Sequence, residues 1–288
     1  MNQETASEIE GYEFLASGSG QRLERWNGII VQRPETAATW PWINREGLPA
    51  WQGYYDSLRA TGGRWQWLSP LPDPSIVRYR NLSFLIRPTE SKHLGLFPEQ
   101  AANWSWIQER ISSAPRKTEP LKVLNLFAYT GAATLAAAAA GASVTHVDAA
   151  RAMVSWCSEN ARLSGLGDAP IRFIVEDASK YLQREIRRGS RYDAIILDPP
   201  SFGRGKNGEL WKLADQLPEL LDAVYTVLSD TPHFVLLNTY SDLSSLEQSP
   251  QALLTNHLGG TCEVAPLSLR GTLDEQTLPC GISYRWTL

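Results

Sequence analysis

The chain has 288 residues, a net charge of −4 and a pI near 5.7, so it is not a broadly basic protein that coats nucleic acid. With 43% hydrophobic and 20% charged residues it can bury a sizeable core, and its length favours one large domain beside a small one. Its longest apolar stretch, residues 135–142, is too short to span a bilayer, and its three widely spaced cysteines predict neither a metal site nor disulfides.

Short alternating runs broken by Gly and Pro, residues 24–34 and 62–74, predict a small β-rich domain over residues 1–80. This segment is rich in tryptophan. The rings either fill the core of a small domain, which we weigh at about two to one, or stack nucleobases. Six of the eleven tryptophans lie here: Trp26, Trp40, Trp42, Trp51, Trp65 and Trp67.

A second, larger domain is expected over residues 81–288, with residues 81–120 as a lead-in hairpin and helix. Pro98 suits the first turn of that helix, and Trp104, Ile107 and Ile111 recur at helical spacing. Basic residues around the domain boundary either form a phosphate track or simply face water. They are Arg78, Arg80, Arg87 and Lys92.

From Lys122 onward, apolar strands alternate with helices, which predicts a parallel sheet covered on both faces. Two final strands with no helix signal between them predict an antiparallel hairpin at one edge. The expected fold is α/β: a doubly wound, mostly parallel seven-stranded sheet with an antiparallel last strand. The expected strands cover residues 122–127, 143–148, 171–177, 192–200, 233–240, 262–269 and 282–288.

Polar residues stand at the ends of the first three of these strands, where a doubly wound sheet binds its ligand. The first strand runs into a turn that closes on Gly131, without the three-glycine pattern of dinucleotide folds. Asp148 ends the second strand, about twenty residues further on, where an acid accepts the hydroxyls of a ribose. Asp177 ends the third strand and can reach an adenine edge. Taken singly, each is also compatible with an ordinary turn or a helix cap.

The fourth strand ends in Asp198-Pro199-Pro200-Ser201-Phe202. Two prolines after a buried strand fix a rigid, extended turn, which presents carbonyl groups and an aromatic ring to a planar group. A generic sharp turn is the alternative, but a carboxylate followed by two prolines and then a phenylalanine is a fairly specific signal.

The segments VLNLFAYTGAAT, THVDAA, VEDAS and ILDPPSFGRG resemble the successive motifs of class I S-adenosylmethionine-dependent methyltransferases. More narrowly, they resemble the bacterial 23S ribosomal RNA methyltransferases that modify cytosine carbon 5 or guanine N7. The resemblance covers roughly the last two-thirds of the chain and extends to KHLGLFPEQAANW, which is similar to the segment that precedes the fold in that group.

The resemblance implies S-adenosyl-L-methionine as cofactor and assigns roles to residues of this chain. The first turn would cradle the methionine part, Asp148 and Ala149 would hold the ribose, and Asp177 and Ala178 the adenine. Asp198 to Phe202 would line the acceptor site, and Asp198 would also contact the cofactor. The first turn consists of Asn125, Phe127, Ala128, Tyr129, Thr130 and Gly131, with Leu126 between the first two. Residues with a weaker assignment to the substrate side are His93, Phe97, Gln100, Arg204, Lys206 and Asn238.

Residues 203–208 are glycine-rich and basic, and they act either as a mobile lid that engages phosphate or as a solvated loop. Methylation of cytosine carbon 5 needs a cysteine thiolate from the turn after the fourth strand or the end of the fifth. Neither Asp198–Ser201 nor Asn238–Ser241 contains a cysteine. We therefore expect a nitrogen acceptor, such as guanine N7 or an exocyclic amine.

Three functions are compatible with these motifs. The first is methylation of a nucleobase in RNA. The second is methylation of a small molecule or a protein side chain, favoured by the acidic pI. The third, a non-catalytic binding protein, predicts loss of the polar strand ends, which are present. The polar, acidic N-terminus lacks the layout of a secretion signal, so we expect a cytoplasmic protein with no membrane partner. The sequence leaves the oligomeric state open, a dimer included.

Overall fold

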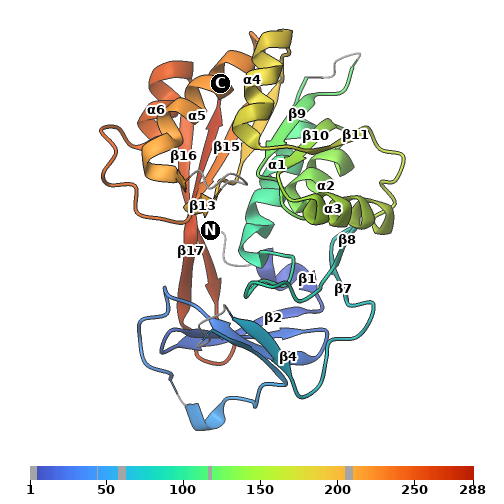
Figure 1. Cartoon of the computed structure of the whole chain (residues 1–288), viewed down its shortest axis with the longest axis vertical. Helices are drawn as coiled ribbons and strands as arrows, with labels where there is room; N and C mark the ends of the chain where they lie inside the picture. Colours follow the sequence, from blue (N-terminus) through green and yellow to red (C-terminus); the bar gives the residue numbers. More distant parts are fainter. Residues whose placement is uncertain (1–4, 44, 58–62, 116–118, 205–209) are drawn as a thin grey trace. The chain divides into compact units, whose positions relative to one another are not determined.

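The computed structural model describes residues 5–43, 45–57, 63–115, 119–204 and 210–288 (Figure 1). The chain forms two compact units. Unit 1 comprises residues 1–102 and 267–280, and unit 2 comprises residues 103–266 and 281–288. Each unit is described by itself below.

Unit 2 is built on a seven-stranded sheet with the strand order β11-β10-β9-β12-β15-β17-β16. The first five are parallel, and β17 runs antiparallel to β15. The central strands β9, β12 and β15 are almost wholly buried and therefore read as largely apolar runs. The predicted fold class is confirmed. The strands are β9 (Lys122–Leu126), β10 (Ser143–Asp148), β11 (Ile171–Val175), β12 (Ala194–Leu197), β15 (Phe234–Thr239), β16 (Thr261–Arg270) and β17 (Thr277–Thr287).

Helices cover both faces of this sheet. Apolar residues of α4, α5 and α6 pack on one face against Leu124 and Leu126 of β9, and these three helices lie together in Figure 1. Ile107 of α1 and Ala137 of α2 pack on the other face, against Val123. The helices are α1 (Ala101–Ser113), α2 (Ala132–Ala139), α3 (Arg151–Leu163), α4 (Ala178–Arg188), α5 (Leu213–Val227) and α6 (Pro250–Leu258).

Strand order reverses between β9 and β12, because the chain adds strands on one side of β9 first and on the other side afterwards. In a doubly wound sheet, a crevice for ligands opens outside the carboxyl ends of the strands at this switch point. The turns after β9, β10, β11 and β12 lie at that edge. The fold therefore directs the search for a site to these four strand ends.

Unit 1 contains a five-stranded sheet, in the order β2-β3-β4-β5-β6, and a three-stranded sheet, in the order β1-β7-β8. Short 3-10 helices, η1 (Thr5–Glu8), η2 (Arg45–Gly47) and η3 (Pro98–Gln100), complete the unit. The strands are β1 (Ile9–Glu10), β2 (Tyr12–Gly18), β3 (Gln21–Trp26), β4 (Ile29–Pro34), β5 (Gly53–Asp56), β6 (Arg64–Trp67), β7 (Ile76–Tyr79) and β8 (Leu82–Leu85).

The compact units divide after Ala102, whereas the sequence analysis placed the domain boundary at residue 80. The difference has a structural cause. Strands β7 and β8 form a hairpin across that position, and β7 also pairs with β1 near the N-terminus. Residues 267–280 also belong to unit 1, and they comprise the end of β16, the connection that follows and the start of β17. Within unit 1, Leu273 donates its backbone N–H to the carbonyl of Leu15.

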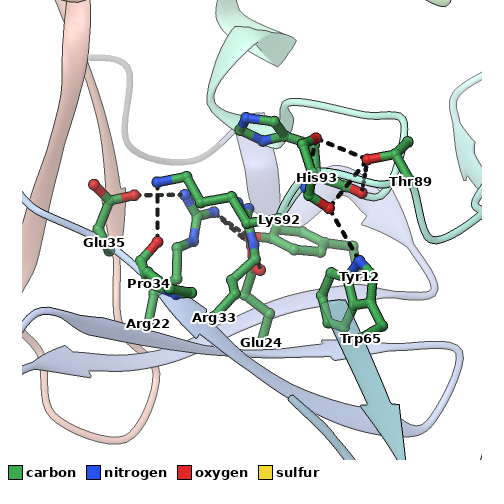
Figure 2. A network of polar contacts seen from close by, with 11 residues as sticks. Tyr12, Arg22, Glu24, Arg33, Pro34, Glu35, Trp65, Thr89, Lys92 and His93 are labelled. Atoms are coloured by element: carbon green, nitrogen blue, oxygen red, sulfur yellow. Dashed lines mark hydrogen bonds and ion pairs between the residues drawn. The ribbon is translucent and has the colours of Figure 1, made fainter. Parts of the chain in front are cut away.

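The core of unit 1 contains a buried ionic network (Figure 2). The Glu24 carboxylate accepts from Arg33 Nε at 2.6 Å and from Arg22 Nη2 at 2.5 Å, and all three side chains are almost fully buried. The phenol of Tyr12 donates to Glu24 as well, at 3.0 Å. Although burial by itself raises the pKa of the Glu24 carboxyl, the two guanidinium groups outweigh it and lower that pKa to about 2. Glu24 is therefore ionised at neutral pH.

The tryptophans of unit 1 contribute to its core to different degrees. Trp26 is fully buried, and its ring lies 4.4 Å from that of Tyr12. Trp42 and Trp51 are half-buried and pack against a core cluster that contains Leu15. The remaining three, Trp40, Trp65 and Trp67, are also half-buried. Core packing accounts for the first three, as the heavier of the two interpretations predicted.

Candidate cofactor and acceptor site

The turn after β9 adopts a backbone that few side chains tolerate. Phe127, Tyr129 and Gly131 all have a positive φ, at 56°, 50° and 90°. For Phe and Tyr this conformation is uncommon and costs energy, and such strain is concentrated at functional sites. A Cβ on Gly131 would lie only 2.0 Å from Sγ of the buried Cys157. Only glycine fits there, so the backbone is bare where the turn enters α2.

Asp148, the last residue of β10, ties this turn to the sheet. Its Oδ2 accepts the backbone N–H of Tyr129 and its Oδ1 accepts that of Ala150, both at 2.8 Å. Burial raises the pKa of the Asp148 carboxyl, and the two backbone hydrogen bonds oppose that rise. A carboxylate offers about four acceptor positions, so two remain in principle for the hydroxyls of a ribose.

The third strand end has a capping function in the structure. Asp177 is the N-cap of α4, and its Oδ1 accepts the N–H of Lys180 at 3.0 Å. Ala178 is buried as the first residue of α4, whereas Asp177 is exposed. Glu176, directly before the cap, pairs with Arg184 at 3.0 Å. An exposed cap beside the end of β11 is a suitable place for an adenine edge.

Asn125 lies in β9 with its side chain turned away from the turn that follows. Strand alternation puts it on the same face as Val123, and its Nδ2 donates to Thr134 Oγ1 in α2 at 2.9 Å. The side chain is 1% exposed. Asn125 thus joins β9 to α2. A contact between its side chain and the cofactor stays a prediction, because the side chain is buried and bonded to Thr134.

The turn after β12 is held from two sides. The Tyr240 phenol donates to Asp198 Oδ1 at 2.6 Å, and Trp211 Nε1 donates to the Pro200 carbonyl at 2.6 Å. The ring of Trp211 also lies 5.4 Å from that of Phe127, which belongs to the turn after β9. Phe202 is 65% exposed. Trp211 therefore connects the turn after β9 with the turn after β12.

Sequence reasoning assigned no role to Trp211 or Tyr240. Trp211 belongs to a small hairpin, β13 (Phe202–Arg204) with β14 (Leu210–Lys212), where the sequence predicted only a glycine-rich loop. The available signal was a large aromatic residue shortly after a glycine-rich segment. Ser201 is half-buried in the same turn, and its carbonyl accepts the N–H of Leu213 at 3.0 Å.

The residues assigned more weakly to the substrate side belong to both units. Asn238 is buried in unit 2, where its Oδ1 accepts from Asn103 and Ser283. The other three described residues, His93, Phe97 and Gln100, belong to unit 1. Burial, together with the charges of Arg33 and Lys92, lowers the pKa of His93 to about 3. Lys206 and the side chain of Arg204 lie outside the described residues.

Comparison with known proteins identifies the family. Residues 33–248 match the model of a family described as S-adenosylmethionine-dependent methyltransferase. The chain belongs to this family. A SAM-dependent methyltransferase from Agrobacterium tumefaciens is 37% identical in its crystal structure, with a TM-score of 0.85, and the match covers 98% of this chain and 91% of that chain. The structure of SMU.776 complexed with SAH is 18% identical, with a TM-score of 0.71 over 97% of this chain and 76% of that one, and shares the fold.

Two curated relatives carry the name ribosomal RNA large subunit methyltransferase K/L. The protein from Syntrophotalea carbinolica is 37% identical over 134 residues, which is 46% of this chain and 17% of that protein. The one from Shewanella frigidimarina is 33% identical over 139 residues, which is 46% of this chain and 19% of that protein. The chain thus matches less than a fifth of the length of these relatives.

The enzyme is therefore a methyltransferase that uses S-adenosyl-L-methionine, as the strand-end motifs predicted. The residues present fit this cofactor. The bare backbone at Gly131 allows close approach, and Asp148 has acceptor capacity beyond its two backbone bonds. Among the described residues no group of three or more His, Cys, Asp and Glu side chains could hold a metal ion. No described helix is long and apolar enough to cross a membrane.

Proposed function

We propose that this enzyme methylates a nitrogen atom of an RNA nucleobase, with ribosomal RNA as the favoured substrate. The names of the two curated relatives support ribosomal RNA, although they are matched over less than a fifth of their length. A ribosomal RNA substrate would place the enzyme in the cytoplasm. The choice of a base, and of nitrogen within it, is argued from the site itself.

The turn after β12 carries the proposal. Two consecutive prolines make it rigid, Asp198 supplies a carboxylate at its start, and Phe202 supplies a largely exposed ring at its end. Exposed aromatic rings stack unpaired bases of RNA, and a carboxylate accepts hydrogen bonds from a base edge. A base within a stack must be turned out to reach such a pocket.

S-adenosylmethionine supplies a methyl group that is already activated by its sulfonium, so the protein mainly aligns the acceptor and excludes water. In our proposal residues 127–131 contact the methionine part, Asp148 with Ala149 holds the ribose, and Asp177 with Ala178 the adenine. Asp198 orients the acceptor, while Phe202 stacks on it. Trp211 links the two halves of this site through Phe127 and Pro200.

The positions of the cysteines favour nitrogen over carbon 5 of cytosine. Cys157 is buried in α3, Cys262 lies in β16 and Cys280 in β17, and none follows β12 or β15. Burial raises the pKa values of Cys157 and Cys280. It also raises the pKa of Cys262, to about 11. Thiols with raised pKa values are not thiolates at neutral pH, and carbon 5 methylation needs a thiolate nucleophile.

Mass spectrometry of ribosomal RNA nucleosides tests this function. We expect a strain without the gene to lack one nitrogen-methylated nucleoside. Complementation with a variant in which Cys157, Cys262 and Cys280 are all alanine should restore it, because no thiol takes part. Expression of the folded variant is checked in the same cells.

Two outcomes would contradict the proposal. Loss of 5-methylcytidine that the folded cysteine-free variant fails to restore would show a thiol mechanism. A nucleoside profile identical to that of the wild type would exclude ribosomal RNA and favour a small molecule or a protein side chain. The net charge of −4 makes that second substrate class the main competitor.

A further inference from the structure

Tyr240 stands beside the acceptor turn with its hydroxyl on the Asp198 carboxylate. It follows directly after β15, and its Oη lies 2.6 Å from Asp198 Oδ1. A hydrogen bond from a hydroxyl to a carboxylate at this length is charge-assisted and about twice as strong as one between neutral groups. The side chain is 38% exposed, so part of it is accessible to solvent.

The neighbouring strand leaves room for this ring. Gly281 of β17 has a φ of 140°, and a Cβ there would lie 2.9 Å from Cδ1 of Tyr240 and 2.7 Å from the carbonyl oxygen of Thr239. The register is fixed two residues further along, where Ser283 faces Asn238 and donates to its Oδ1 at 2.7 Å. The tyrosine ring is thus packed against a position that only glycine can occupy.

Buried polar contacts make the end of β15 rigid. Asn103 Nδ2 donates to Asn238 Oδ1 at 3.0 Å and to Ser283 Oγ at 2.7 Å. Arg285 in turn donates through Nη2 to Asn103 Oδ1 at 2.8 Å. These side chains are at most 4% exposed. Tyr240 therefore extends from a fixed strand end, and its hydroxyl has a defined place.

We propose that Tyr240 is a positioning residue for methyl transfer, which holds the Asp198 carboxylate in the orientation that receives the acceptor. This inference rests on the proposed function to the extent that it takes the turn after β12 as the acceptor wall. Asp198 starts a rigid turn, and Trp211 anchors the carbonyl of Pro200 within it. The Tyr240 hydroxyl adds a constraint on the carboxylate itself, through Asp198 Oδ1. Alignment of reacting groups is lost with displacements of about 1 Å.

The test is Tyr240→Phe, which keeps the ring and removes the hydroxyl. The acceptor is RNA from a strain without the gene, and the methyl donor is tritiated S-adenosylmethionine. We expect kcat/KM for RNA to fall roughly ten- to hundredfold, which corresponds to loss of one hydrogen bond to a charged group. The dissociation constant of S-adenosylmethionine should change by less than about twofold, because Tyr240 lies at the acceptor side of the site.

Tyr225→Phe is the matched control. It removes a single phenol donor, whose 2.9 Å hydrogen bond to the carbonyl of Leu253 joins α5 to α6. Its turnover should equal that of the wild type. A purely stabilising role for Tyr240 predicts that both variants lower the melting temperature and leave kcat/KM unchanged.

A double variant separates positioning through Asp198 from a direct effect. Asp198→Asn lowers turnover by itself, and adding Tyr240→Phe to it should cost less than about threefold more, because contacting residues are not additive. Wild-type turnover in Tyr240→Phe, or full additivity in the double variant, would overturn the inference.

The proposed function can fail separately. If the wild type, given a whole lysate of the strain without the gene, labels protein or small molecules and not RNA, the proposed RNA substrate is wrong. Tyr240→Phe and Tyr225→Phe are then compared on the labelled fraction. Absence of label in every fraction would contradict both proposals.

Discussion

At the scale of single residues, Asp148 shows how one side chain can fix a turn. Its two oxygens accept the backbone N–H groups of Tyr129 and Ala150, which holds the strained turn where we propose that the cofactor binds. The sequence predicted a ribose contact from the place of this acid at the end of a strand. The sequence did not reveal the hydrogen bond between Asp148 and Tyr129. That bond depends on positive φ angles at Phe127 and Tyr129, and because neither residue is a glycine, the sequence does not indicate them.

Asp148→Ala should weaken binding of S-adenosylmethionine by roughly 2–4 kcal/mol, because two charge-assisted hydrogen bonds are lost. The carboxyl pKa is raised by burial, so affinity of the wild type should fall as the pH is lowered through that raised pKa, and the variant should lack this dependence. Titration calorimetry at several pH values measures both.

Ser249→Ala is a suitable control for that experiment. Ser249 caps α6 by accepting the N–H of Ala252 at 3.2 Å, so its loss should cost about 1 kcal/mol of stability without any effect on cofactor affinity. Unchanged affinity in folded Asp148→Ala would show that the ribose is held elsewhere.

At the scale of elements, the sequence predicted what local patterns determine. The five parallel strands and the helices between them follow from apolar runs and helical spacing, and they lie within a few residues of the predicted ranges. Two features escaped. The strands β13 and β14 are three residues each, too short for an alternating pattern. The pairing of β7 with β1 joins segments distant in sequence, so the boundary at residue 80 could not be judged locally.

The side chains of Asn125 and Asn238 show that the contacts of the candidate site were also harder to predict than its position in the sheet. Both stand at strand ends, as predicted, but alternation within the strand turns the Asn125 side chain to Thr134 in α2, and Asn238 accepts from Asn103 and Ser283. Position along a strand could be predicted from the sequence. Which face a residue takes, and what it meets there, depends on packing between elements.

The buried ionic network that joins β3 and β4 gives a prediction about stability. Glu24→Gln leaves Arg22 and Arg33 without their shared carboxylate, and should lower the free energy of unfolding by about 3–5 kcal/mol. The folded-state pKa of Glu24 is about 2, below that of an unfolded glutamate. Its contribution is therefore fully present above the unfolded pKa of about 4.3, and is lost as the pH falls from there towards 2.

Urea unfolding of wild type and variant at neutral and acidic pH measures this effect. Glu8→Gln is the control, because Glu8 pairs with Arg80 at 3.2 Å while both side chains are more than 40% exposed. Such exposed pairs contribute at most about 1 kcal/mol. Equal destabilisation by both variants, or a Glu24→Gln effect that does not shrink towards pH 2, would contradict the buried-network account.

At the scale of the whole molecule, the family follows from a match over residues 33–248, which includes parts of both units, and the strand order of unit 2 places four turns at one edge of its sheet. The substrate depends on more than this. The half-buried Trp65 and Trp67 of unit 1, whose rings lie 5.2 Å apart and nearly parallel, are accounted for neither by the core clusters described nor by the cofactor site. The substrate proposal rests on the turn after β12, on the positions of the cysteines and on the names of the two curated relatives.

The most direct test of this proposal is transfer of a tritiated methyl group from S-adenosylmethionine to ribosomal RNA purified from a strain without the gene. The account predicts label in the RNA, recovered after digestion as a base methylated at nitrogen. It also predicts that Asp198→Ala loses at least about 90% of this transfer while keeping its cofactor affinity, since in the proposed site the carboxylate orients the acceptor. Label confined to protein or small molecules, or full transfer by Asp198→Ala, would contradict it.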